Sequence, residues 1–70
     1  MGESLQSLEQ KIIAMLMKEP QSVSELARKL GMRRDFLAGY LESMKDRTLL
    51  RLITIGKSHV YLPEEDVANV

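Results

Sequence analysis

The feature that most constrains the fold of this chain is a short helix whose start and stop are both signalled in the sequence. The run Ser22-Val23-Ser24-Glu25 has the S-x-x-E form of a capping box, in which the serine hydroxyl and the glutamate carboxylate each satisfy a backbone N–H. Gly31 then ends the helix, because glycine adopts the left-handed conformation at little cost. A helix of about eight residues is not stable by itself. The chain must therefore fold as several small elements that share one core.

The spacing of apolar residues predicts a longer helix on each side of the short one. The first runs from Ser4 to Glu19 and stops there, because Pro20 disfavours helix in the residue before it. The other runs from Arg33 to Arg47. In both segments apolar side chains recur at steps of three and four residues, so they share one helix face. They are Leu5, Leu8, Ile12, Met15 and Leu16 in the first helix, and Phe36, Leu37, Tyr40, Leu41 and Met44 in the other.

After Arg47 the apolar pattern changes from a helical to a strand period. Residues 49–55 and 58–62 are predicted strands, and Gly56-Lys57 between them fits a type II′ hairpin turn. In this register Leu52 lies opposite Tyr61 on one face, and Ile53 lies opposite Val60 on the other. One apolar face must pack on the helices. The other is either partly exposed or covered by a second subunit, so a homodimer through this face or through the first helix is expected.

The predicted order is three helices followed by a two-stranded hairpin, which is an α+β fold that is mostly α. A chain of 70 residues has room for one domain. We expect residues 1–70 to form that domain, with a core over 5–62 and a short acidic tail over 63–70. Pro63 suits the first position of a helical turn in this tail.

The net charge of zero hides an uneven distribution. Residues 28–59 hold eight basic and three acidic side chains, whereas both ends of the chain carry an acidic excess. A basic middle fits a protein that presents one face to a polyanion. Ordinary scatter on a solvated surface gives the same count, so charge alone does not decide the function.

Several function classes are disfavoured. The chain has no cysteine and one histidine, His59, so neither a metal site nor a bound cofactor is expected. There is no nucleophile–base pair and no glycine-rich loop, so an enzyme is not expected. The longest apolar run, Ile12 to Met17, is far short of the roughly 20 residues of a membrane span. With no signal peptide in view, a cytoplasmic protein is the expectation.

The arrangement resembles the winged helix-turn-helix family. The resemblance rests on residues 22–32 with the pattern S-x-x-E-L-A-x-x-L-G-M, on the apolar steps of the following helix, and on the hairpin that closes at residue 62. It covers about residues 5–62. MarR-like regulators, ArsR-like regulators and the small fimbrial-operon regulators all fit the pattern.

This resemblance implies a sequence-specific transcriptional regulator that binds double-stranded DNA. The third helix would be the recognition helix in the major groove, and the turn at 55–59 would be the wing. Arginines at the helix start would bond guanine, small residues would let the helix sit deep, and flanking cations and serines would meet phosphates. The implied contact residues are Ser22, Ser24, Arg33, Arg34, Ala38, Gly39, Lys45, Lys57, Ser58 and His59.

The alternative is a winged-helix module that binds another protein in a larger complex. Asp35 and Glu42 share the outward face of the third helix with the basic residues, and phosphate repels carboxylates. Ser22 is in the first place a helix cap, and Gly39 is either a point of close approach or simply tolerated.

Overall fold

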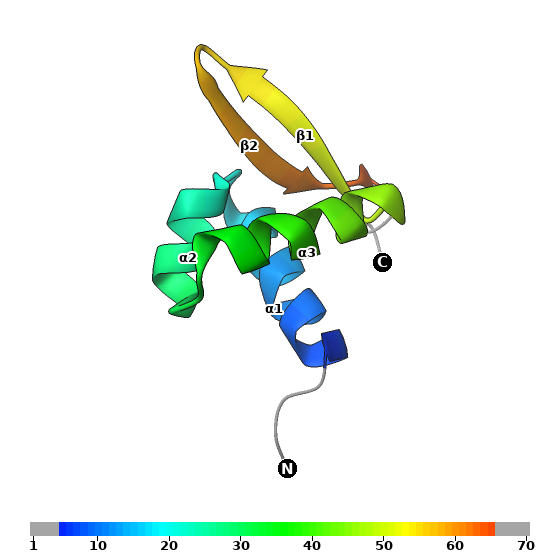
Figure 1. Cartoon of the computed structure of the whole chain (residues 1–70). Helices are drawn as coiled ribbons and strands as arrows, with labels where there is room; N and C mark the ends of the chain where they lie inside the picture. Colours follow the sequence, from blue (N-terminus) through cyan, green and yellow to red (C-terminus); the bar gives the residue numbers. More distant parts are fainter. Residues whose placement is uncertain (1–4, 66–70) are drawn as a thin grey trace.

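The computed structural model describes residues 5–65 and contains three helices followed by a hairpin. The three helices pack together, and the hairpin rises from them as a narrow two-stranded ribbon (Figure 1). This order confirms the α+β class expected from the sequence. The elements are α1 (Leu5–Lys18), α2 (Val23–Leu30), α3 (Arg34–Asp46), β1 (Leu50–Ile55) and β2 (Ser58–Pro63).

The helix ends differ from the predicted ends by about one residue. α1 ends at Lys18, one residue earlier than predicted, and Ser4 lies outside the described residues. Arg33 was expected inside the third helix, but its φ of −71° and ψ of 137° are extended, so it precedes the helix as the N-cap residue. Arg47 follows α3 as the C-cap.

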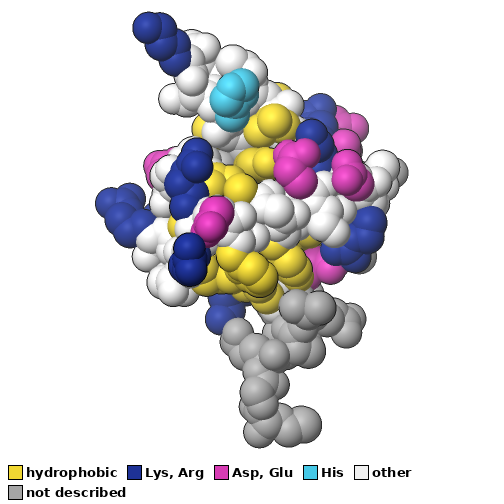
Figure 2. All heavy atoms as spheres, viewed as in Figure 1, with side chains coloured by type: hydrophobic (Ala, Val, Ile, Leu, Met, Phe, Trp, Pro, Cys, Tyr) yellow, Lys and Arg dark blue, Asp and Glu magenta, His cyan; other side chains and the backbone are white. Residues whose placement is uncertain are grey.

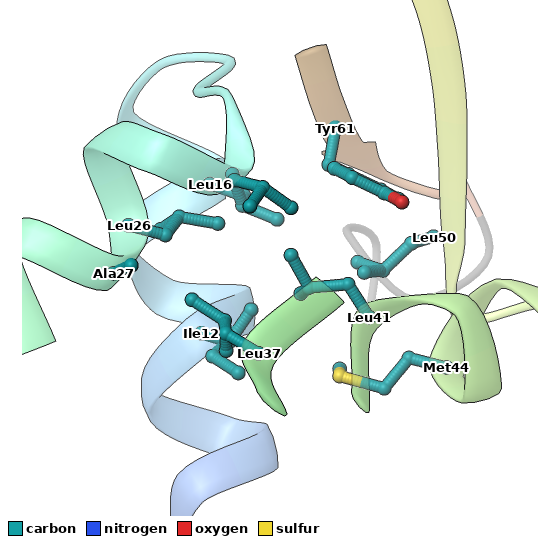
Figure 3. Close-up of a cluster of buried hydrophobic side chains, with 10 residues drawn as sticks. Ile12, Leu16, Leu26, Ala27, Leu37, Leu41, Met44, Leu50 and Tyr61 are labelled. Carbon is teal, nitrogen blue, oxygen red and sulfur yellow. The ribbon is translucent and has the colours of Figure 1, made fainter. Parts of the chain in front are cut away.

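The core lies between the three helices and the base of the hairpin (Figure 3). Each element contributes fully or nearly fully buried side chains to it. These are Ile12, Leu16, Val23, Leu26, Ala27, Leu37, Leu41, Met44, Leu50 and Tyr61. Ala38 and Tyr40 of α3 are partly buried, whereas Phe36 stays 55% exposed and stacks on Tyr40 with ring centroids 6.4 Å apart.

The hairpin has the predicted register. Leu52 pairs with Tyr61 and Ile53 pairs with Val60, so the two apolar faces are the expected ones. Gly56 has a φ of +61°, and Lys57 does not share a positive φ, which is the combination that a type II′ turn requires. The expectation for Pro63 was wrong, because it ends β2 rather than beginning a helical turn. The rest of the tail lies largely outside the described residues.

A short extended piece before α2 joins the sheet. The amide of Gln21 donates to the Tyr61 carbonyl at 3.3 Å, and the Tyr61 amide donates back to Gln21 at 2.8 Å. The Gln21 side chain is 2% exposed, donates to the Met15 carbonyl at 3.2 Å and accepts from Lys29 at 2.8 Å. The link between α1 and α2 is thereby tied to β2.

Candidate nucleic-acid interface

A cleft of about 520 Å³ lies between the helices and the inner face of the hairpin. The start of α2 and one side of α3 form its helical wall, and the hairpin forms the opposite wall. Seven of the ten residues expected from the sequence to touch DNA line this cleft. They are Ser22, Ser24, Arg34, Ala38, Lys57, Ser58 and His59.

The other three expected residues lie elsewhere. Arg33 pairs with Asp35 at 3.4 Å and lines a separate hollow beside Phe36. Gly39 is exposed, and a Cβ built there meets nothing within 4 Å, so no close approach within the described chain requires glycine. Lys45 pairs with the Glu42 carboxylate at 3.1 Å.

The helical wall is organised by local hydrogen bonds. The predicted capping box is present: the Ser22 hydroxyl accepts from the Glu25 amide at 3.2 Å, and Glu25 accepts from the Ser22 amide at 2.9 Å. The hydrogen bond from the Ser22 backbone amide, followed by the interaction with the Ser22 hydroxyl, lowers the pKa of the Glu25 carboxyl. The Arg34 Nε donates to the Ser24 hydroxyl at 2.9 Å, which joins the first turn of α2 to the first turn of α3.

The lining of the cleft includes a carboxylate, that of Glu42, with two partners. The Tyr61 hydroxyl donates to Glu42 Oε2 at 2.7 Å, and the Lys45 ammonium lies 3.1 Å from Glu42 Oε1. The hydrogen bond from Tyr61 and the one from Lys45 lower the pKa of Glu42. Burial and the same contact with Glu42 raise the pKa of Tyr61 to about 12. Glu42 is therefore a charged group whose oxygens already have donors.

The hairpin wall carries polar and basic groups near its tip. Lys57 occupies the turn, and His59 Nδ1 lies 3.3 Å from the Thr54 hydroxyl across the strand pair. On this side of the molecule, Figure 2 shows basic side chains and the single histidine interspersed with acidic ones. Within residues 5–65, no cluster of three acidic, histidine or cysteine residues is arranged to hold a metal ion.

Sequence reasoning missed the residues that connect the two walls. Gln21, Glu42 and Tyr61 make contacts between elements rather than within one. The extended residue between Pro20 and the capping box was the one available signal for the Gln21 bridge. No sequence signal identified Glu42 as the acceptor for Tyr61.

The described residues contain no helix with both the length and the apolar character needed to cross a bilayer. No protein-family model matches the chain, and no curated protein matches it. Solved structures, in contrast, match the chain. The homodimeric winged helix-turn-helix DNA-binding domain Mb0332 from Mycobacterium bovis, described as a "possible ArsR-family transcriptional regulator", is 25% identical with a TM-score of 0.77.

The transcriptional regulator HlyU from Vibrio vulnificus is 25% identical with a TM-score of 0.75, and HlyU from Vibrio cholerae is 23% identical with a TM-score of 0.73. These matches cover 83% to 84% of this chain but 55%, 62% and 65% of the respective neighbours. The chain thus spans less than two thirds of each neighbour's length. Its helices, hairpin and structural neighbours agree that this chain has the winged helix-turn-helix fold.

Proposed function

We propose that this chain is a DNA-binding transcriptional regulator that receives duplex DNA at the cleft between α3 and the hairpin. The observation that carries the proposal is the convergence of seven expected contact residues, from three separate elements, on one cleft. The neighbours support it, since Mb0332 is a DNA-binding domain and HlyU is a transcriptional regulator.

The side of α3 that faces the cleft is the side suited to DNA. Arg34, Ala38 and Glu42 follow one another at four-residue steps and line the cleft together. Asp35 and Gly39, each one residue further along the helix than Arg34 and Ala38, are exposed and do not line the cleft. A major groove about 12 Å wide admits one helix. We propose that α3 enters it with the Arg34–Ala38 side leading, so that the Asp35 carboxylate lies outside the contact surface.

Each wall has a distinct role in this proposal. Arg34 reads guanine, because a guanidinium can bond O6 and N7 together, and Ala38 leaves room for a base edge. Lys57, Ser58 and His59 on the wing meet the sugar–phosphate backbone. At the start of α2, the amides and Ser24 add a phosphate contact, since helix N-termini favour anions.

Arg33, Gly39 and Lys45 take secondary roles. Arg33 and Lys45 flank the cleft at opposite ends of α3 and add long-range attraction to phosphate. Gly39 has no side chain and therefore adds no steric bulk to the exposed side of the helix. None of the three is proposed as a base reader.

We also propose that the chain binds DNA as a homodimer, as the Mb0332 domain is homodimeric. The outer hairpin face is one candidate interface, because Ile55 is 58% exposed there, and α1 is the other, with Met17 54% exposed. Light scattering at high micromolar concentration tests this directly. A monomeric mass would contradict it.

The test of DNA binding is a titration of random-sequence duplex across a salt series. We expect affinity to fall steeply as salt rises, because neutralised phosphates release counterions. Arg34→Glu should abolish binding while leaving the protein folded by circular dichroism. Arg33→Glu has the same charge change outside the cleft and should weaken binding less. Equal losses of DNA affinity in the two variants would contradict the proposal that the cleft is the DNA-binding site.

A second function is favoured by one surface. Phe36 is 55% exposed beside Tyr40, and the exposed Asp35 lines the same hollow as Phe36. These features fit a winged-helix module that binds another protein. No binding to duplex DNA even at about 50 mM salt would favour this alternative.

A further inference from the structure

We propose that the Tyr61 hydroxyl and the Glu42 carboxylate form a latch that sets the position of the wing relative to α3. This inference rests on the proposed DNA-binding function and deepens it. It makes Glu42 and Tyr61 positioning residues of the cleft, although sequence alone presents Glu42 as a repulsive charge.

The geometry of the latch places it between the two walls. Glu42 lies on the cleft side of α3, one helical turn beyond Ala38 and two beyond Arg34. Tyr61 comes from the half of β2 nearer the base of the hairpin. Their oxygens are 2.7 Å apart, which is the short distance of a hydroxyl bound to an ionised acceptor. The bond therefore ties the recognition helix to the hairpin within the lining of the cleft.

The Tyr61 side of the latch is anchored at the base of the hairpin. Its ring is buried in the core with 6% of the residue exposed (Figure 3). Its backbone makes two hydrogen bonds to Gln21 at 3.3 and 2.8 Å. Burial and the Gln21 bonds anchor the base of the hairpin, and the hydroxyl bond to Glu42 adds the side-chain link between this base and α3.

The hairpin from the Leu52–Tyr61 pair to the turn is largely exposed. Leu52 and Ile55 are 37% and 58% exposed, and every residue from Thr54 to His59 is exposed. His59 lies two residues before Tyr61 and on the same face of the ribbon. Fixing Tyr61 against α3 therefore sets the distance at which His59 and the turn face Arg34.

The charge of Glu42 is compatible with a DNA cleft because both of its oxygens are engaged. Oε2 accepts from Tyr61, and Oε1 pairs with Lys45. Two readings then make opposite predictions. As a latch, Glu42 helps DNA binding through its hydrogen bond. As a bare charge, it only opposes DNA binding.

Comparing Glu42→Gln with Glu42→Ala separates these readings. Both variants remove the negative charge, but the glutamine amide oxygen can still accept from Tyr61. We expect Glu42→Gln to bind random-sequence duplex about two- to tenfold more tightly than Glu42→Ala. A difference of this size corresponds to the cost of ordering a few side chains at an interface. In a Tyr61→Phe background that difference should disappear. Equal affinities for the two variants in the wild-type background would overturn the latch.

A matched control uses the other tyrosine of the chain. Tyr61→Phe should lower DNA affinity about two- to tenfold. Tyr40→Phe also removes one phenol hydroxyl from the molecule, at a residue outside the cleft lining, and should leave affinity unchanged. Circular dichroism and thermal melts confirm that each variant is folded at the assay temperature.

A distance measurement keeps the latch testable without DNA. The chain has no native cysteine, so Lys57→Cys and Ser43→Cys can carry one spin label each. We expect the label-to-label distance distribution to broaden in Tyr61→Phe and to stay narrow in Tyr40→Phe. Unchanged distributions would overturn the latch. If the wild-type chain fails to bind DNA while Tyr61→Phe broadens the distribution, the proposed function fails and the latch stands.

Discussion

The two walls of the cleft are built in different ways. The helical wall stands on side chains with no exposure, Leu26 in α2 and Leu37 in α3, and is reinforced by the capping box at Ser22. The hairpin wall is buried only at its base, through Leu50 and Tyr61, and its strands run out into solvent. The first wall is part of the core, and the second is attached to it.

Because the two walls differ in burial, substitutions in them should have different effects. A change behind the helical wall alters the free energy of unfolding of the whole molecule, because the side chains of that wall are core side chains. A change toward the tip of the hairpin alters where the wing sits and what it contacts. Substitutions behind the helical wall should therefore mainly lower stability. Substitutions near the tip of the hairpin should mainly lower DNA affinity.

The largest effect is expected behind the helical wall. Leu37 is fully buried, so Leu37→Ala removes apolar contacts and leaves a cavity, at a cost of about 2–5 kcal/mol. Leu52→Ala on the hairpin, where the side chain is 37% exposed, should cost clearly less. Urea unfolding measures both. A larger loss of unfolding free energy for Leu52→Ala would mean that the hairpin wall contributes more to stability than the helical wall.

At the base of the hairpin, Tyr61→Phe should lower stability by about 1–2 kcal/mol at neutral pH, because a hydrogen bond to a charged acceptor is lost. The pKa of Tyr61 is raised to about 12, so this group stabilises the fold fully below its unfolded pKa of about 10. That contribution is lost as pH rises from 10 through 12. Melts at increasing pH should show a smaller alkaline loss in Tyr61→Phe than in the wild type.

The cap of the helical wall should show an intermediate effect. Ser22→Ala removes the acceptor for the Glu25 amide and should cost about 1 kcal/mol. Ser24→Ala removes a hydroxyl whose partner, Arg34, is exposed, and it should change stability less. Thermal denaturation of the two variants compares them. Equal melting temperatures would mean that the capping box contributes little here.

The smallest effect on stability is expected at the wing tip. Lys57→Ala should leave the free energy of unfolding within about 0.5 kcal/mol of the wild-type value, because the side chain is exposed. The same variant should weaken DNA binding and reduce the salt slope by about one, as one phosphate contact is lost. An unchanged salt slope would mean that Lys57 does not contact a DNA phosphate.

The sequence was sufficient where a signal and its effect lie within one element. The capping box at Ser22, the helix end at Gly31 and the turn at Gly56 each depend on a few neighbouring residues, and all three are present. The hairpin register also follows from the turn, because a two-residue loop leaves one pairing for the strands. The wing was therefore predicted in detail, although it is the less buried wall.

The sequence was insufficient where two elements meet. Arg33 and Arg34 look equivalent in the chain, but α3 begins at Arg34 and successive residues on a helix are about 100° apart. One arginine therefore lines the cleft, and the other faces Asp35 outside it. The contact of Glu42 with Tyr61 depends likewise on how the hairpin sits over α3, which no local pattern specifies.

The bridge between Gln21 and Tyr61 sets the order in which this molecule can fold. Contacts between neighbouring helices close short loops, whereas this bridge joins residues separated by more than half of the chain. Non-local pairings form slowly because loop entropy is lost before they give any stabilisation. We expect α2 and α3 to associate first and β2 to dock last. On a ribosome, the hairpin would find its place only after residues through the end of β2 at Pro63 had been synthesised.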